Sequence, residues 1–146
     1  MDKVVEDITC KQYTSDITEE IWKEVLPFVE DAAQYSHWEF KARNVLQGLI
    51  EGLVQLWTVR DHGELKFVWV TEIQTQVSSK RVVLVTAAAG ESKYGWKFWP
   101  WMSQWMIGNG IEEAEVYCRP SMARLLRRKG LKTRYEVLTI PPMELL

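Results

Sequence analysis

The sequence lacks the features that mark several specialised classes of protein. No apolar run approaches the ~20 residues of a membrane-spanning helix, and the first residues, Met1 to Glu6, lack the basic-then-apolar order of a signal peptide. Cysteine is scarce. Cys10 and Cys118 have no metal-binding spacing, and we interpret both as buried free thiols in a reducing compartment. The formal net charge of -2 gives no basic excess, so nucleic-acid binding is not indicated.

Motifs for the common chemistries are also missing. The chain has no Walker loop, dinucleotide fingerprint, Ser/His/Asp set or metal-ligand cluster. Its two histidines, His37 and His62, fall at an expected helix start and in an expected turn, where surface positions are usual. No metal site is therefore predicted.

Tryptophan, in contrast, is abundant. The 146 residues suit one domain, 1–146, and the 47% hydrophobic and 26% charged shares are ordinary for a globular protein. Eight tryptophans are not ordinary, because large aromatic side chains either fill cores or mark interfaces.

Apolar periodicity predicts the element order β, α, α, β, β, β, α, β, α, β. The expected strands are 4–10, 53–60, 65–74, 81–86, 113–118 and 131–140. Helices are expected to begin near Thr18 and Ser36 and to cover 97–107 and 121–129. Pro27 should kink the first helix or divide it. We expect 53–60, 65–74 and 81–86 to form an antiparallel meander. A helical crossover should pair 81–86 with 113–118 in parallel, splayed at their C-terminal ends.

This order, with one motif in the tail, resembles the GNAT (N-acetyltransferase superfamily) fold over nearly the full chain. The motif is Arg119-Pro120-Ser121-Met122-Ala123-Arg124-Leu125-Leu126-Arg127-Arg128-Lys129-Gly130-Leu131. Ala123 and Gly130 match the family's helix as written, and Leu131 stands where Phe is usual. The resemblance implies an α/β (α+β) fold with a mixed, mostly antiparallel sheet, a splayed parallel strand pair and flanking helices. In that family acyl-CoA lies between the splayed strands.

The loop expected over 87–95 departs from the family's pyrophosphate pattern, Gln/Arg-x-x-Gly-x-Gly/Ala. Gly90 and Gly95 stand five apart with Glu91 between them, and Pro100 is expected to remove a donor near the helix start. Lys93 and Lys97 would partly compensate by charge. The candidate cofactor-binding residues are Gly90, Lys93, Gly95 and Lys97, and a plain strand-to-helix loop is the alternative.

The residues that perform the family's chemistry are mostly missing. Leu126 occupies the position of the usual Tyr acid, and Pro120 that of an Asn that often begins the motif. Tyr94 and Tyr117 are the remaining candidates for the acid, and Glu72 is the candidate base. Each of these three also has an ordinary structural interpretation, so no catalytic residue is assigned.

Two surfaces are candidates for binding a partner. In the Trp-rich segment, Trp99, Met102 and Met106 form one helical stripe and Trp101 and Trp105 an adjacent one. Two aromatic stripes exceed what one sheet face covers, so some of Trp96, Trp101 and Trp105 are expected to be exposed. The second surface is the basic tail helix with Arg124, Arg127 and Arg128. The alternatives are a buried core helix and a helix end stabilised by its dipole.

The tail run also resembles small GNAT-like proteins of tailed phages. It implies, as the leading hypothesis, a non-catalytic virion-assembly or internal virion protein, located in the virion or the host cytoplasm. Such a protein would bind a phage structural or assembly protein, or a second copy of itself, and need no cofactor. The alternative is an acyl-CoA-dependent N-acetyltransferase that uses acetyl-CoA, and a third hypothesis is a host-directed binding factor.

Overall fold

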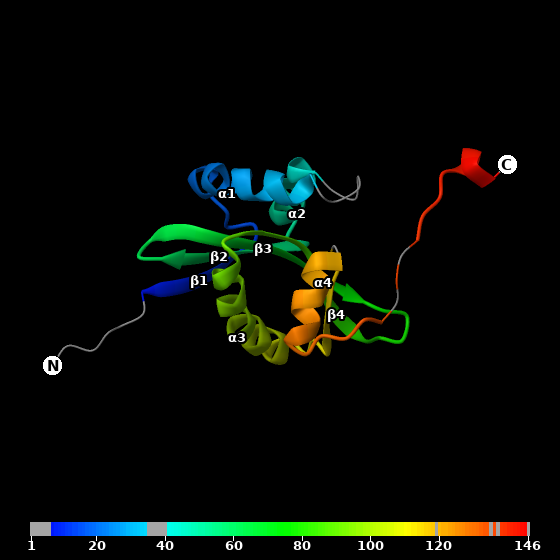
Figure 1. Ribbon diagram of the computed structural model, residues 1–146. Helices are drawn as coiled ribbons and strands as arrows, with labels where there is room; N and C mark the ends of the chain where they lie inside the picture. The colour runs from blue at the N-terminus through cyan, green and yellow to red at the C-terminus, as the bar shows by residue number, and fades with distance from the viewer. Residues whose placement is uncertain (1–6, 35–40, 119, 135, 137, 146) are drawn as a thin grey trace. The chain divides into compact units, whose positions relative to one another are not determined.

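Five strands form the central sheet of the computed structural model, which describes residues 7–34, 41–118, 120–134, 136 and 138–145 (Figure 1). The described chain divides into two compact units, Met1–Val116 and Tyr117–Leu146. The first contains β1 (Ile8–Tyr13), α1 (Glu19–Ala33), α2 (Ala42–Ile50), β2 (Val54–Asp61), β3 (Glu64–Thr75), β4 (Arg81–Gly90), α3 (Ser92–Gly108) and β5 (Glu113–Val116). The second contains α4 (Pro120–Arg128) and a 3-10 turn, Pro142–Leu145. One domain over 1–146 stays a prediction.

The strands lie in the order β1-β2-β3-β4-β5. Neighbours are antiparallel from β1 to β4, whereas β4 and β5 are parallel and joined through α3. The predicted meander and parallel crossover are therefore confirmed. No helix among the described residues is long and apolar enough to cross a bilayer.

Helices cover both faces of the sheet. Figure 1 shows α1 and α2 on one side and α3 on the other. The first face is mainly aliphatic, with Val25, Leu49, Leu56 and Val70 in its core. We call it the aliphatic face. The second face carries a mainly aromatic core, and we call it the aromatic face. Its buried members include Trp57, Phe67, Trp69, Tyr94, Phe98 and Met102, and Trp99 and Trp105 pack against them.

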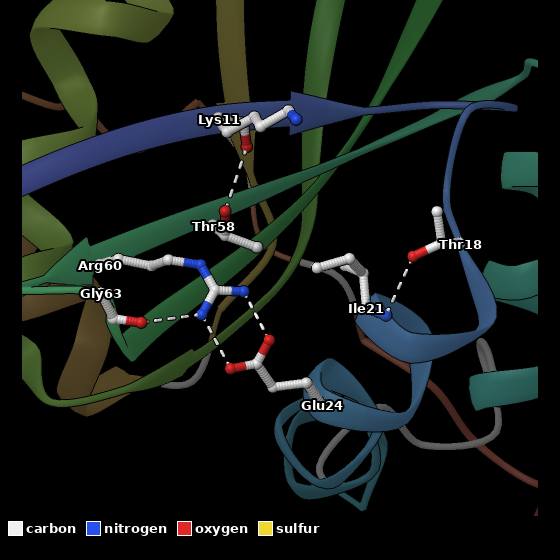
Figure 2. Close-up of polar contacts among 7 residues, drawn as sticks. All are labelled: Lys11, Thr18, Ile21, Glu24, Thr58, Arg60 and Gly63. Atoms are coloured by element: carbon white, nitrogen blue, oxygen red, sulfur yellow. Dashed lines mark hydrogen bonds and ion pairs between the residues drawn. The ribbon is translucent and has the colours of Figure 1, made fainter.

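Helix α1 is fixed by a cap and an ion pair. Thr18 Oγ1 accepts a hydrogen bond from the Ile21 N–H at 3.2 Å. Glu24 receives two hydrogen bonds from the Arg60 guanidinium, at 2.8 and 2.5 Å, and Arg60 also donates to the Gly63 carbonyl at 3.1 Å (Figure 2). Pro27 lies inside α1 without dividing it, so that alternative was wrong.

Several predicted boundaries differ from the structure. The first strand begins at Ile8 and runs to Tyr13, and the expected residues 4–6 lie outside the described part of the chain. The helix start expected over 36–39 also lies outside it, and α2 begins at Ala42. There the Lys41 N–H donates to Asn44 Oδ1 at 3.0 Å. The strand expected over 113–118 ends at Val116.

The last predicted strand, 131–140, was wrong. Its described residues, 131–134, 136 and 138–140, form no strand, and the side chains of Leu138 and Ile140 are 88% and 51% exposed. Alternation of apolar residues favours a strand only where a neighbouring backbone pairs with it, and these residues have no strand partner within the described chain.

Candidate functional site

The parallel strand pair ends well before β4 does. Its register runs from Val82↔Glu113 to Val85↔Val116, whereas β4 continues to Gly90. Beyond Val85 no strand of the first unit's described residues pairs with β4 on the β5 side. The backbone of 86–90 is therefore free of strand pairing along one edge.

An irregularity in the sheet coincides with this point. Val70 pairs with Ala87 and Thr71 with Val85, so Thr86 is the extra residue of a bulge. The Thr86 hydroxyl donates to the Val70 carbonyl at 3.3 Å. A bulge bends its strand and increases the local twist, so it redirects β4 where β5 stops.

The predicted loop 87–95 is in fact strand and helix. The strand part of this segment places small residues opposite the large ones of β3. Its pairs are Ala87 with Val70, Ala88 with Trp69 and Ala89 with Val68. Gly90 has a φ of 133°, and a Cβ there would lie 2.7 Å from the Phe67 Cα. Glycine is therefore required where β4 meets β3 and turns into α3.

Helix α3 begins directly after this glycine, at Ser92. Glu91 is its N-cap, but the Glu91 side chain makes no capping hydrogen bond. The first amides of a helix have no intrahelical acceptor and carry the positive end of its dipole, so they attract anions. Lys93 is exposed in this turn, whereas Lys97 is half-buried.

The expected effect of Pro100 at the helix start was wrong. Pro100 lies in the middle of α3, far beyond the first turn, so its missing N–H removes no donor from the helix start. Gly95 is likewise inside the helix and buried, and a Cβ there would lie 3.4 Å from the Phe67 ring. That distance is an ordinary van der Waals contact, so the packing of α3 against β3 does not require a glycine at this position.

A hydrogen-bonded group at this end of the sheet was not predicted. The Tyr94 hydroxyl donates to Asp61 Oδ2 at 2.6 Å, and Asp61 Oδ1 lies 2.6 Å from His62 Nδ1. The bond from Tyr94, with a smaller effect of His62, lowers the pKa of the Asp61 carboxyl. The bond to Asp61 raises the pKa of the Tyr94 phenol. Tyr94 therefore links the start of α3 to the end of β2, and its role as a catalytic acid stays a prediction.

Cationic and acidic side chains surround the hydrogen bond between Tyr94 and Asp61. The Lys66 ammonium lies 3.2 Å from Glu64 and 3.6 Å from Glu91, and 5.9 Å from the centre of the Tyr94 ring. The Lys93 ammonium lies 5.1 Å from the same ring. The sequence analysis did not single out Lys66, because a strand pattern does not show which distant segment lies beside it. The start of α3, at Ser92, is 26 residues further along the chain.

The other candidate catalytic residues are not brought together with Tyr94. Glu72 is half-buried on β3 between Val54 and Leu84, and strand alternation gives it the face of Val68 and Val70, as predicted. Tyr94 contributes to the opposite, aromatic face. Tyr117 is exposed and belongs to the second unit. Leu126, at the family's acid position, lies on α4.

Two of the four tryptophans of α3, Trp99 and Trp105, pack against the aromatic core. Trp105 meets Trp57 edge-on with centroids 5.2 Å apart, and Trp99 meets Trp69 at 5.4 Å. Trp96 is half-buried, and Trp101 is 39% exposed. The prediction that some of Trp96, Trp101 and Trp105 are exposed is therefore confirmed for Trp101, whereas Trp105 packs against the core.

The remaining predicted residues have simple environments. Arg124, Arg127 and Arg128 are exposed on α4, and Arg127 donates to the Thr133 hydroxyl at 2.7 Å. Cys10 and Cys118 are free thiols, and burial raises the pKa of Cys10 to about 12. Cys118 is exposed, contrary to the prediction, because β5 ends before it. No group of three or more potential metal ligands occurs among the described residues.

Comparison with known proteins was informative only at the level of structure. No family model and no curated protein matches the sequence. An aminoglycoside acetyltransferase, meta-AAC0020 from an uncultured soil metagenomic sample, solved with sisomicin, superposes with a TM-score of 0.70 at 10% identity. The match covers 92% of this chain and 95% of that one. The aminoglycoside N-acetyltransferase AAC(6')-Iy, solved with CoA, gives a TM-score of 0.72 at 8% identity over 97% and 98% of the two chains.

A third similar structure is the ribosomal-protein-alanine N-acetyltransferase of Brucella melitensis biovar Abortus 2308. It gives a TM-score of 0.67 at 11% identity over 92% and 98% of the two chains. The chain has the GNAT fold. Identities this low establish the GNAT fold alone, so the activity has to be argued from this chain's own residues.

Proposed function

We propose that this protein binds acyl-CoA and transfers the acyl group to an amine, as an N-acetyltransferase with acetyl-CoA as donor. The observation that carries this proposal is the unpaired edge of β4, over 86–90, leading through Gly90 into the start of α3. Free backbone amides and carbonyls can pair with the amide groups of a pantetheine chain. The first turn of α3 then offers its amides and Lys93 to the diphosphate.

The chemistry forms a carbon–nitrogen and a sulfur–hydrogen bond and breaks a carbon–sulfur and a nitrogen–hydrogen bond. The amine nitrogen attacks the thioester carbonyl carbon, and the carbon–sulfur bond breaks to release CoA thiolate. The amine loses a proton, which we assign through water to Glu72, and the thiolate takes a proton from water. A thiol has a pKa of about 8.5, so its thiolate leaves without an obligatory acid. A missing general acid therefore slows turnover, by roughly 10²–10⁴-fold, rather than abolishing it.

Thermal unfolding with acetyl-CoA tests the proposal directly. Ligand at ~100 times its dissociation constant should stabilise the folded protein by about 2.7 kcal/mol, which shifts the melting temperature clearly. Release of free thiol with a panel of primary amines then tests transfer, and Glu72→Gln should lower the transfer rate while leaving binding unchanged. The absence of any thermal shift at millimolar acetyl-CoA would exclude the proposed donor.

A second candidate is the non-catalytic binding protein of a phage virion or its assembly, or a host-directed factor. Two observations favour it: Leu126 supplies no acid, and the side chains of Trp101 and Ile107 on α3 are 39% and 81% exposed. Binding would use this part of α3 and the arginines of α4. Sedimentation of the purified chain with and without Trp101→Ala tests the self-binding form, and a purely monomeric wild type would count against it.

A further inference from the structure

The start of α3 is held to the sheet by few hydrogen bonds. Glu91 does not cap the helix, and its N–H donates to the Lys66 carbonyl at 3.0 Å. Gly90, immediately before it, has the freest backbone of any residue type. Among the side chains of 92–95, all of which the structure describes, Tyr94 is the one with a hydrogen bond to the sheet.

That bond joins two segments 33 residues apart in sequence. Asp61 is the last residue of β2, and the tight turn that follows has φ values of 51° at His62 and 80° at Gly63. The turn is itself fixed, because the His62 N–H donates to the Asp7 carbonyl at 3.0 Å. The Tyr94 side chain is 6% exposed, so its ring is packed as well as hydrogen-bonded.

We propose that Asp61 and Tyr94 are a positioning pair that fixes the first turn of α3 for binding the diphosphate of acyl-CoA. Tyr94 sets the position of the turn, and Asp61 holds the hydroxyl of Tyr94. The amides of Ser92 and Lys93 then keep one geometry before the ligand arrives, which lowers the entropic cost of binding. The proposal rests on the proposed function for its ligand. Neither residue touches the reacting atoms.

Two ligands separate positioning from general stability. Tyr94→Phe keeps the ring and removes the hydroxyl, and it should weaken acetyl-CoA binding about tenfold, the scale of one hydrogen bond to a charged group. Binding of an acetylated pantetheine thioester, which lacks the diphosphate, should change less than twofold. Asp61→Asn keeps a neutral acceptor, should weaken acetyl-CoA binding less than Tyr94→Phe does, and serves if Tyr94→Phe does not fold. Equal weakening of both ligands, or of neither, overturns the proposal.

Tyr13→Phe is a matched control. Tyr13 is also buried, at 7% exposed, its phenol interacts with Arg60, and it belongs to the aliphatic face. Removal of its hydroxyl should leave the ratio of the two affinities at the wild-type value. If Tyr13→Phe changed the ratio of the two affinities as much as Tyr94→Phe does, the positioning role assigned to Tyr94 would be overturned.

Amide hydrogen exchange separates this proposal from the proposed function. Without ligand, exchange of the amide of residue 94, whose N–H donates to the Glu91 carbonyl at 3.0 Å, should be about tenfold faster in Tyr94→Phe than in the wild type or in Tyr13→Phe. If the wild type binds neither ligand, the acyl-CoA function fails, and the exchange data alone decide whether the pair fixes this turn. Unchanged exchange of this amide overturns the positioning role whatever the ligands do.

Discussion

Both faces of the sheet are covered by helices, but different side chains fill the two cores. The aliphatic face closes with valine and leucine against two amphipathic helices, and its ion pair, Arg60 with Glu24, lies at the rim. The aromatic face closes with tryptophan and phenylalanine against one helix. It also encloses polar atoms, since within the described part of the chain the buried indole N–H groups of Trp69 and Trp99 have no hydrogen-bond partner.

This difference indicates where the fold departs from the best packing. An unsatisfied buried donor costs roughly 1–3 kcal/mol, so two of them are not expected of a face selected for stability alone. The aromatic face also contains a buried polar chain, in which Trp57 Nε1 donates to Thr71 and the Thr71 hydroxyl donates to Gln55, each at 2.9 Å. Departures of this kind concentrate at functional sites, and this face lies beside the unpaired end of β4.

The largest expected effect comes from Phe98, the centre of the aromatic face. It is fully buried, with its ring 5.2 Å from Trp57 and 4.6 Å from Trp69. Phe98→Ala should lower the free energy of unfolding by about 3–5 kcal/mol, and the equally buried Leu49→Ala on the aliphatic face by about 2–5 kcal/mol. Urea denaturation measures both. A clearly smaller loss for Phe98→Ala would show that the aromatic face is loosely packed and would break the comparison.

Two tryptophans of α3 sharpen the distinction between core and surface. Trp105→Ala removes the contact with Trp57 and should cost about 3 kcal/mol or more of stability. Trp101→Ala should cost at most about 1 kcal/mol, because the side chain is 39% exposed. Equal losses in denaturation would mean that both side chains are core. If Trp101 is a hot spot of an interface, its loss should instead weaken association by about 2 kcal/mol or more.

The ion pair of the aliphatic face gives a pH-dependent prediction. The hydrogen bond from Arg60, more than its charge, lowers the pKa of Glu24 below its ordinary 4.5. A carboxyl whose folded pKa is lowered stabilises the protein above its unfolded pKa, and the contribution is lost as the pH falls through the folded value. Glu24→Gln should therefore cost about 1 kcal/mol at pH 7, since the pair is partly exposed, and progressively less below pH ~4.5. A pH-independent difference in unfolding free energy would contradict the assignment.

The sequence predicted the architecture better than the site, for a physical reason. Apolar alternation in 65–74 and the Gly63 turn are local signals, and they placed the ends of β2 and β3 within one residue. Ala87 to Ala89 have low strand propensity, so only pairing with β3, which is not local, makes them strand. Asp61 indicated a turn and Tyr94 a candidate acid, and nothing in either local pattern shows that they meet. Glu72 could be assigned to its face because alternation is local, but a reaction partner for it could not.

The smallest expected effect concerns Glu91. Like Glu24 on the aliphatic face, Glu91 is a carboxylate paired with a cation, but it lies beside the aromatic face. Its side chain is 56% exposed, and the Lys66 ammonium lies 3.6 Å away, so the pair contributes little to stability. A carboxylate at a helix start stabilises the helix, but there it repels an anionic ligand. Glu91→Gln should therefore lose only a few tenths of a kcal/mol in denaturation.

The same change should tighten acetyl-CoA binding by about twofold to fivefold, because repulsion falls and Lys66 is released toward the diphosphate. The gain should shrink as salt is raised, since the Glu91 side chain is exposed to solvent. Glu24→Gln, on the other face, should leave the affinity unchanged. Weaker binding in Glu91→Gln would place the diphosphate away from the start of α3. It would then also contradict the functional role that we give to the aromatic face.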